Sequence, residues 1–219
     1  MEKKAVVVLS GGMDSASLLY WAKANYKTVS AISINYGQRH SKELDCARTL
    51  CGLTDVEYDV VDLSSIKSLL KGNALTDNIE VPEGHYESSS MKLTVVPNRN
   101  MLLLSVALCS ACVKDADVVL YGAHFGDHAI YPDCRKEFVE ALDKASRLCW
   151  YKEIKIVAPF VDKTKTDIAR LGTELGVQFE HTWSCYKGEE KHCGKCGTCV
   201  ERIEAFSDSG IEDITEYAE

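Results

Sequence analysis

Six residues near the N-terminus, Ser10 to Ser15 (SGGMDS), have the composition of a phosphate-binding turn. They follow the apolar run AVVVL and precede a helical stretch, where backbone N–H groups and the helix dipole attract anions. Two glycines let the backbone approach a phosphate closely, and the serines add hydroxyl donors. Asp14 would repel a bare phosphate, so it fits best beside Mg2+ or as a helix cap. An ordinary glycine-rich turn is the alternative.

Four cysteines near the C-terminus have spacing suited to a metal ion. In the string CYKGEEKHCGKCGTC, two glycines permit sharp turns that bring the thiolates to one point. A tetrahedral Zn2+ site with all four positions filled would be structural rather than catalytic. An iron–sulfur centre is the alternative. His181 and His192 are expected to be bystanders. The predicted metal ligands are Cys185, Cys193, Cys196 and Cys199.

Length and composition limit the classes of protein that fit. A chain of 219 residues with 46% hydrophobic content can bury one sizeable core. We expect a main α/β domain over 1–180 and a small helical metal-binding segment over 181–219. The net charge of −8 disfavours direct nucleic-acid binding. No stretch is expected to span a membrane, and scattered cysteines indicate a reducing, cytoplasmic setting.

Apolar strands alternate with helical patterns along the chain. This alternation predicts a Rossmann-like parallel sheet with helices on both faces and ligands at the carboxyl ends of the strands. A polar, mobile connection is expected over 72–91. The predicted strands are 5–9, 28–34, 56–61, 117–121 and 154–157, and the predicted helices are 16–24, 41–50 (capped by Ser41), 100–113, 136–148 and 164–175.

The turn and the cysteines lead to a resemblance. SGGxDS after a buried strand resembles the pyrophosphate-binding loop of the N-type ATP pyrophosphatase (PP-loop) superfamily, which has an adenine nucleotide alpha hydrolase-like fold. Nearly end to end, the chain is similar to the 7-cyano-7-deazaguanine synthase family. The matching strings are LSGGMDSASLL (9–19), NYGQRHSKEL (35–44), VPNRNMLLLS (96–105), YPDCRKEF (131–138) and CGKCGTC (193–199).

The resemblance implies a C–N bond-forming ligase. In that family, 7-carboxy-7-deazaguanine, ammonia and ATP give the 7-cyano base through an amide, in queuosine- or archaeosine-type pathways. ATP is needed because a carboxylate is a poor electrophile and hydroxide a poor leaving group. The loop favours an AMP-forming step, although an ADP-forming one is also compatible. Free ammonia or an unlinked partner would supply nitrogen, and the resemblance suggests a homodimer.

The resemblance also implies site residues. Arg99 can present a two-pronged donor to a carboxylate or phosphate, and Lys165 lies where the family has its lysine. Catalytic roles are expected for Asp14, Ser15, Arg99 and Lys165. Binding of ATP is expected for Leu9, Ser10, Gly11, Gly12, Met13, Asp14, Ser15, Tyr36, Gln38 and Arg39, and substrate binding for Asn98, Arg99, Asn100, Tyr131, Asp133 and Arg135.

Some positions leave alternatives open. The family commonly has Gly at Asn98 and Glu at Asp167, changes that keep small size or polarity. Cys134 could be a nucleophile, but a buried bystander is favoured, and contacts from the loop 124–128 are uncertain. Competing functions are a tRNA sulfur-inserting enzyme of the same superfamily, a ligase that transfers a deazapurine to a protein, and a non-catalytic nucleotide-binding module.

Overall fold

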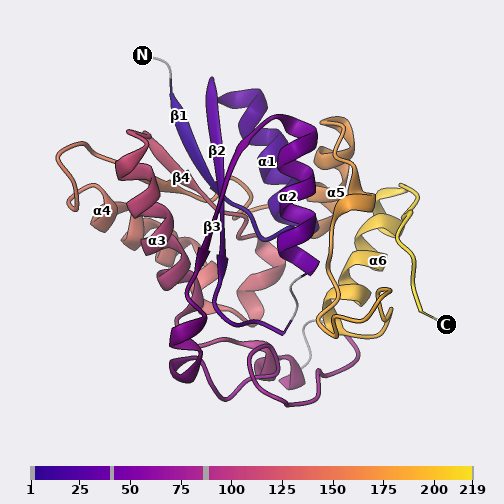
Figure 1. Cartoon of the computed structure of the whole chain (residues 1–219). Coiled ribbons are helices and arrows are strands. Elements are labelled where there is room, and N and C mark those ends of the chain that lie inside the picture. Colours follow the sequence, from indigo (N-terminus) through magenta and orange to yellow (C-terminus); the bar gives the residue numbers. More distant parts are fainter. Residues whose placement is uncertain (1–2, 40–41, 86–88, 219) are drawn as a thin grey trace.

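A parallel β-sheet forms the centre of the molecule (Figure 1). The computed structural model describes residues 3–39, 42–85 and 89–218. The strand order is β3-β2-β1-β4-β5, and every neighbouring pair is parallel. The strands are β1 (Lys4–Val8), β2 (Thr28–Asn35), β3 (Glu57–Asp62), β4 (Val118–Leu120) and β5 (Lys155–Val157).

Helices cover both faces of this sheet, as the alternation predicts. Side chains alternate along β1, so that Val7 packs with α1, α2 and α5 while Val6 packs with α3 and α4. Figure 1 shows α3 and α4 on one side of the strands and the other helices opposite. The helices are α1 (Met13–Asn25), α2 (Lys42–Thr54), α3 (Arg99–Val113), α4 (Lys136–Ser146), α5 (Lys165–Glu174) and α6 (Gly197–Ser209).

Strand order places the functional turns together. Strand β1 lies between β2 and β4, so the chain runs outward in opposite directions from β1. In such sheets the crevice at the carboxyl ends of the strands, where the order reverses, is the usual ligand site. The turn after β1 and the segments after β2 and β4 therefore meet at one edge of the sheet.

One apolar segment, Ser90–Val113, is long enough to cross a membrane by length and composition alone. Within it, the α-helix itself is α3, and Leu104, Ala107 and Ala111 are buried in the core between this helix and the sheet.

The connection that precedes α3 is more than a polar linker. Asn73 is buried, its Oδ1 accepts the N–H groups of Leu75 and Thr76, and its amide donates to the Leu70 carbonyl. Because these hydrogen bonds join a side chain to the backbone of its own segment, they build a compact loop that packs against the domain. The predicted Ser41 cap of α2 lies outside the described residues.

Candidate active site

A cavity opens at the carboxyl ends of β1, β2 and β4. It is bordered by the turn after β1, the start of α2, the start of α3 and the segment after β4. Residues from all these elements are far apart in sequence and meet only through the sheet order. Of the predicted site residues, the cavity lining includes Leu9, Ser10, Gly12, Met13, Asp14, Ser15, Tyr36, Gln38, Arg99, Asn100, Tyr131 and Lys165.

The SGGMDS turn is held by the side chain of Ser15. Its Oγ accepts the N–H groups of Ser10 at 3.2 Å and Gly11 at 3.1 Å, and donates to the Gly12 carbonyl at 3.1 Å. Ser10 Oγ lies 3.0 Å from Ser15 Oγ and accepts the Gly12 N–H. The N–H groups of Ser10, Gly11 and Gly12 thus converge on two serine hydroxyls at the N-terminus of α1, and an anion that displaced these hydroxyls would meet the same donors.

Gly11 is required by the turn. Its φ is +94°, and a Cβ built there would lie 2.1 Å from the Glu43 carbonyl oxygen. Gly11→Ala is expected to lower the free energy of unfolding by about 2 kcal/mol or more, because strain and the backbone clash add. Gly52→Ala is the control, since Gly52 is helical with open space around it. Urea unfolding measures both; equal stability of the two variants would contradict the account.

Lys165 reaches the turn from α5. Thr164 caps this helix in a capping box with Asp167, which fixes Lys165 at the first helical position. Lys165 Nζ lies 2.6 Å from Asp14 Oδ2 and 3.2 Å from Glu201 Oε2 of α6. Burial opposes its charge, yet these carboxylates raise the pKa of Lys165 above its usual range. A permanent cation therefore stands beside the phosphate-binding turn.

Asp14 is a buried carboxylate with spare capacity. Burial opposes its charge, but Lys165 and His124 hold the pKa of Asp14 below its usual value, so it is ionised at neutral pH. One oxygen bonds Lys165, whereas Oδ1 has no hydrogen-bond partner among the described residues. A free carboxylate oxygen beside a phosphate turn fits a magnesium ligand.

His124 and Asp127 complete this end of the cavity. His124 is almost fully buried, and its Nδ1 accepts the Gly126 N–H at 3.1 Å. That bond assigns the ring proton to Nε2, which lies 3.4 Å from Asp127 Oδ2 and 3.4 Å from Lys165 Nζ. The loop whose contacts were uncertain from sequence therefore packs on Lys165.

Arg99 lines the same cavity from the start of α3, among tyrosine side chains rather than in the Lys165 cluster. It opens α3 directly after Asn98, whose φ of +55° explains why Gly or Asn suits that position. The Asn98 side chain does not cap the helix. Burial works to lower the pKa of Arg99. The hydroxyls of nearby tyrosines, including Tyr36, which is hydrogen-bonded to Arg99, outweigh this effect and raise the pKa of Arg99 above its ordinary value. Its guanidinium carbon lies 5.9 Å from the Tyr131 ring.

Several predicted residues lie outside the cavity lining. Arg39 donates to the Ile79 carbonyl at 2.8 Å, and exposed Arg135 donates to the His128 carbonyl at 2.9 Å. Asp133 accepts the Asn100 N–H at 3.3 Å, at the start of α3. The ATP-binding role of Arg39 and the substrate-binding roles of Asp133 and Arg135 stay predictions. Gly11 and Asn98 also lie outside the lining and act through backbone shape.

Cys134 lines the cavity but has no activating partner among the described residues. Its thiol is buried and accepts the Asn100 side-chain N–H at 3.3 Å. Burial and nearby carboxylates raise the pKa of Cys134, so the thiol is protonated and a poor nucleophile. This environment agrees with the bystander expected from sequence.

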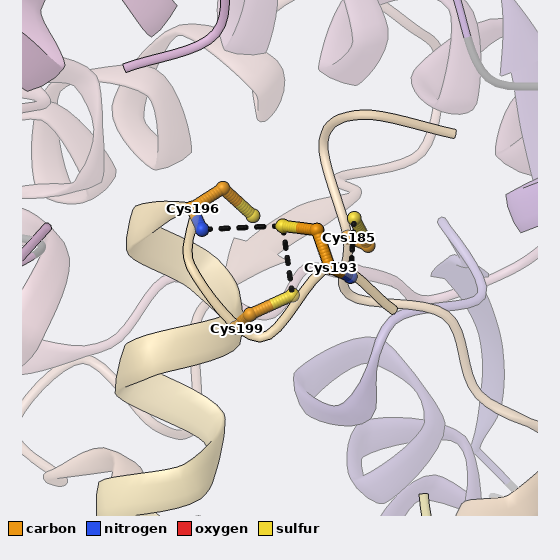
Figure 2. A group of neighbouring side chains, drawn as sticks. All are labelled: Cys185, Cys193, Cys196 and Cys199. Atoms are coloured by element: carbon orange, nitrogen blue, oxygen red, sulfur yellow. Dashed lines mark hydrogen bonds between the residues drawn. The ribbon is translucent and has the colours of Figure 1, made fainter. Parts of the chain in front are cut away.

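The four C-terminal cysteines converge as their spacing predicts (Figure 2). Their Sγ atoms all lie within 4.8 Å of one another, and all four residues are buried. Backbone N–H groups point at the sulfurs: Cys193 Sγ accepts from Lys195 at 3.4 Å and from Cys196 at 3.2 Å. Zn–S bonds of about 2.3 Å in a tetrahedron give S–S separations near 3.8 Å. The donor set and spacing therefore fit one metal ion.

The cysteine segment also forms a wall of the cavity. Trp183 N–H donates to the Gly11 carbonyl at 2.9 Å, and its indole N–H donates to the Cys185 carbonyl at 2.9 Å. Thr198 Oγ1 donates to the Ser184 carbonyl at 2.7 Å. His192 is buried; its Nε2 accepts the Ser184 N–H, and burial lowers the pKa of His192 to about 4.

Several residues that line the cavity or pair with Lys165 were not predicted from sequence to belong to the site. They are Glu43, Asp127, Trp183, Ser184, Tyr186, Thr198 and Glu201.

The strand order and the helices on both faces define a doubly wound α/β protein with a cavity at the carboxyl ends of its parallel strands. The chain belongs to the QueC family: the model described as "Queuosine biosynthesis protein QueC" matches residues 4–210. A relative from Hahella chejuensis, described as 7-cyano-7-deazaguanine synthase, is 53% identical over 98% of this chain and 93% of its own. One from Caldicellulosiruptor bescii with the same description is 54% identical over 98% and 97%.

Solved structures share the fold at low identity. A 4-thiouridine synthetase–RNA complex with bound ATP aligns with TM-score 0.56 and 16% identity, over 95% of this chain and 51% of that one. The U34-tRNA thiolase NcsA from Methanococcus maripaludis, with its [4Fe-4S] cluster, gives TM-score 0.52 and 20% identity over 95% and 66%. The chain thus spans about half to two thirds of these proteins, and the likeness concerns the fold alone.

Proposed function

We propose that this protein is an ATP-dependent C–N ligase that converts 7-carboxy-7-deazaguanine and ammonia to 7-cyano-7-deazaguanine. The single observation that carries the proposal is that Lys165 and Asp14 at the SGGMDS turn share one cavity with Arg99. A triphosphate at one end and a carboxylate at the other is the arrangement that carboxylate activation needs. Full-length relatives with this description support the choice of substrate.

The chemistry requires two activations. A substrate carboxylate oxygen attacks the α-phosphate of ATP and pyrophosphate leaves, which gives an acyl adenylate. Ammonia then displaces AMP and loses a proton to form the amide. The amide oxygen then attacks the α-phosphate of a second ATP and pyrophosphate leaves. AMP departs with that oxygen while the nitrogen loses two protons, which leaves the nitrile. The turn favours AMP formation, although the sequence is also compatible with an ADP-forming step.

Each end of the cavity has a distinct task in this scheme. The donors of the turn and Lys165 bind the phosphates, and Ser10 and Ser15 fix the shape of the turn. Arg99 offers parallel N–H groups to the substrate carboxylate. Asp14 Oδ1 would hold Mg2+, which would neutralise phosphate charge when bound.

The metal at the four cysteines is proposed to be a structural Zn2+, one per chain. Complete sulfur coordination leaves no open position for a reactant, as is typical of structural sites. The iron–sulfur alternative is less favoured, because a multi-iron cluster separates its cysteine sulfurs more widely than a single ion does. Metal analysis of the purified protein distinguishes zinc from iron.

Assembly and setting follow from surface features and the resemblance. Exposed apolar side chains lie on and beside α3 and α4, namely Val113, Leu148, Trp150 and Tyr151. Such a surface supports a homodimer. The ten cysteines, all within the described residues, form no disulfide, which supports a cytoplasmic location. No direct nucleic-acid contact is proposed for this acidic chain.

Mass spectrometry of the base tests the function. Purified protein is incubated with ATP, Mg2+, ammonium and the 7-carboxy base, and the proposal predicts amide and nitrile products. A tRNA sulfur-inserting enzyme is the second candidate, but only low-identity fold neighbours favour it. Base consumed without either product points to the deazapurine-transferring ligase. No consumption of base by folded, metal-loaded protein would refute the proposal.

A further inference from the structure

The end of the cavity around Arg99 is built to hold a flat, charged molecule, a conclusion that rests on the proposed function. Tyr36 and Tyr131 are buried there, and Tyr186 from the cysteine segment adds a third ring. Among the described residues, no carboxylate forms an ion pair with Arg99, whose hydrogen-bond partner is the Tyr36 hydroxyl. A partly buried guanidinium without a bonded anion is suited to take one from the substrate.

Glu43 is the carboxylate that faces this end. It is the second residue of α2 and lines the cavity, with its backbone carbonyl packed against Gly11. Arg99 attracts the Glu43 carboxylate without forming an ion pair with it. Burial, only partly offset by Arg99, raises the pKa of Glu43 to about 7. An incoming group with hydrogen-bond donors would therefore stabilise its ionised form.

A guanine-type ring offers two such donors side by side. Its N1–H and 2-amino groups lie on the edge opposite the five-membered ring that carries the 7-carboxylate. A carboxylate can accept both donors at once, as it does from a guanidinium. The geometry points to Glu43 as the specificity-determining residue that binds the N1–H and 2-amino edge, while Arg99 binds the 7-carboxylate.

The other acidic side chains fit this role less well. Asp133, which was predicted from sequence to bind the substrate, accepts the Asn100 N–H at the start of α3 and does not line the cavity. Asp127 lines it but lies 3.4 Å from His124 Nε2, in the Lys165 cluster at the phosphate end. Glu43 is thus the acceptor on the Arg99 side of the cavity.

Steady-state kinetics with two bases test the role. Wild type is compared with Glu43→Gln on 7-carboxy-7-deazaguanine and on the analogue that lacks the 2-amino group. Wild type should prefer the amino-bearing base on the order of 10- to 100-fold in kcat/KM, because the analogue leaves a buried acceptor unpaired. In the variant this preference should fall to a few-fold, with an unchanged KM for ATP. Asp45→Asn, an exposed carboxylate on the same helix, is the control.

Each outcome has a defined meaning. The assignment is overturned if Glu43→Gln keeps the wild-type preference between the two bases. It is also overturned if the variant raises the KM for ATP and not the KM for the base. No turnover by wild type with either base refutes the proposed function instead. A folding defect would show in thermal unfolding, and the wild-type comparison of the two bases needs no variant. Folding raises the pKa of Glu43 from 4.5 to about 7, so wild type should lose stability as pH rises through this range, with no further loss from Glu43 at higher pH. Glu43→Gln lacks this loss and should therefore be no less stable than wild type above pH 7.

Discussion

Replacing Lys165 with methionine is expected to lower kcat/KM on the order of a thousandfold. Lys165 Nζ lies beside Asp14 at the SGGMDS turn and is the cation best placed to meet charge that develops on the transferred phosphate. Fixed charges aimed at a transition state contribute roughly 100- to 1,000-fold or more in rate. Methionine keeps the length and apolar stem but removes the charge. Pyrophosphate or phosphate release, measured with the base and ammonium, gives the rate.

Stability must be separated from catalysis in this variant. Lys165→Met leaves the buried carboxylates of Asp14 and Glu201 without their cation, so its melting temperature should fall. The double variant Asp14→Asn with Lys165→Met should regain stability but not activity. Lys163→Met, two residues earlier and outside the cavity lining, is the control and should retain near wild-type turnover. Full activity in folded Lys165→Met would show that the phosphates bind elsewhere.

Loss of the bound metal is expected to cause the second largest effect, on both stability and activity. Cys196→Ser removes one ligand of the four-sulfur set and should yield protein with substoichiometric metal. Structural zinc sites contribute roughly 10 kcal/mol to the folding of small domains, so a loss of several kcal/mol is expected here. Activity should fall as well, because Trp183, Tyr186 and Thr198 line the cavity.

Elemental analysis and thermal unfolding check this prediction together. Wild type should carry one metal ion per chain and melt well above the variant. Cys109→Ser is the control, since Cys109 is a free, exposed cysteine on α3 and should keep both metal and activity. Equal melting temperatures and rates for Cys196→Ser and wild type would mean that the cysteines neither bind a metal nor support the cavity wall.

The architecture of the sheet was predictable because its signals are local. Uninterrupted β-branched runs such as Ala5 to Leu9 have few alternatives to a strand buried on both faces. Helical stretches between them then require right-handed crossovers and a parallel sheet. The four cysteines were equally predictable, since C-x2-C spacing alone brings thiolates together.

The cavity was less predictable because its members come from distant segments. Tyr186 and Glu201 lie beside the predicted metal ligands in sequence, but nothing in the sequence shows that Tyr186 lines the cavity or that Glu201 pairs with Lys165. Both contacts depend on how the cysteine segment folds back over the turn. Glu43 looks like an ordinary acidic residue in the first turn of a helix. Its function becomes visible only beside Arg99.

Proximity in sequence did not show which side chains of one turn line the cavity. Asp133 and Arg135 flank Cys134 in a short 3-10 turn, and the three side chains point in different directions. Cys134 lines the cavity, Asp133 accepts the backbone N–H of Asn100, and Arg135 is exposed. A residue pattern shows that a turn is special but not which of its side chains faces the ligand.

A crystal structure with a non-hydrolysable ATP analogue and Mg2+ tests the central claim most directly. The account predicts the triphosphate within hydrogen-bond distance of the N–H groups of the SGGMDS turn and of Lys165 Nζ, with its α-phosphate directed towards Arg99. A triphosphate bound at any other place, with the turn still closed on the Ser15 hydroxyl, would contradict it.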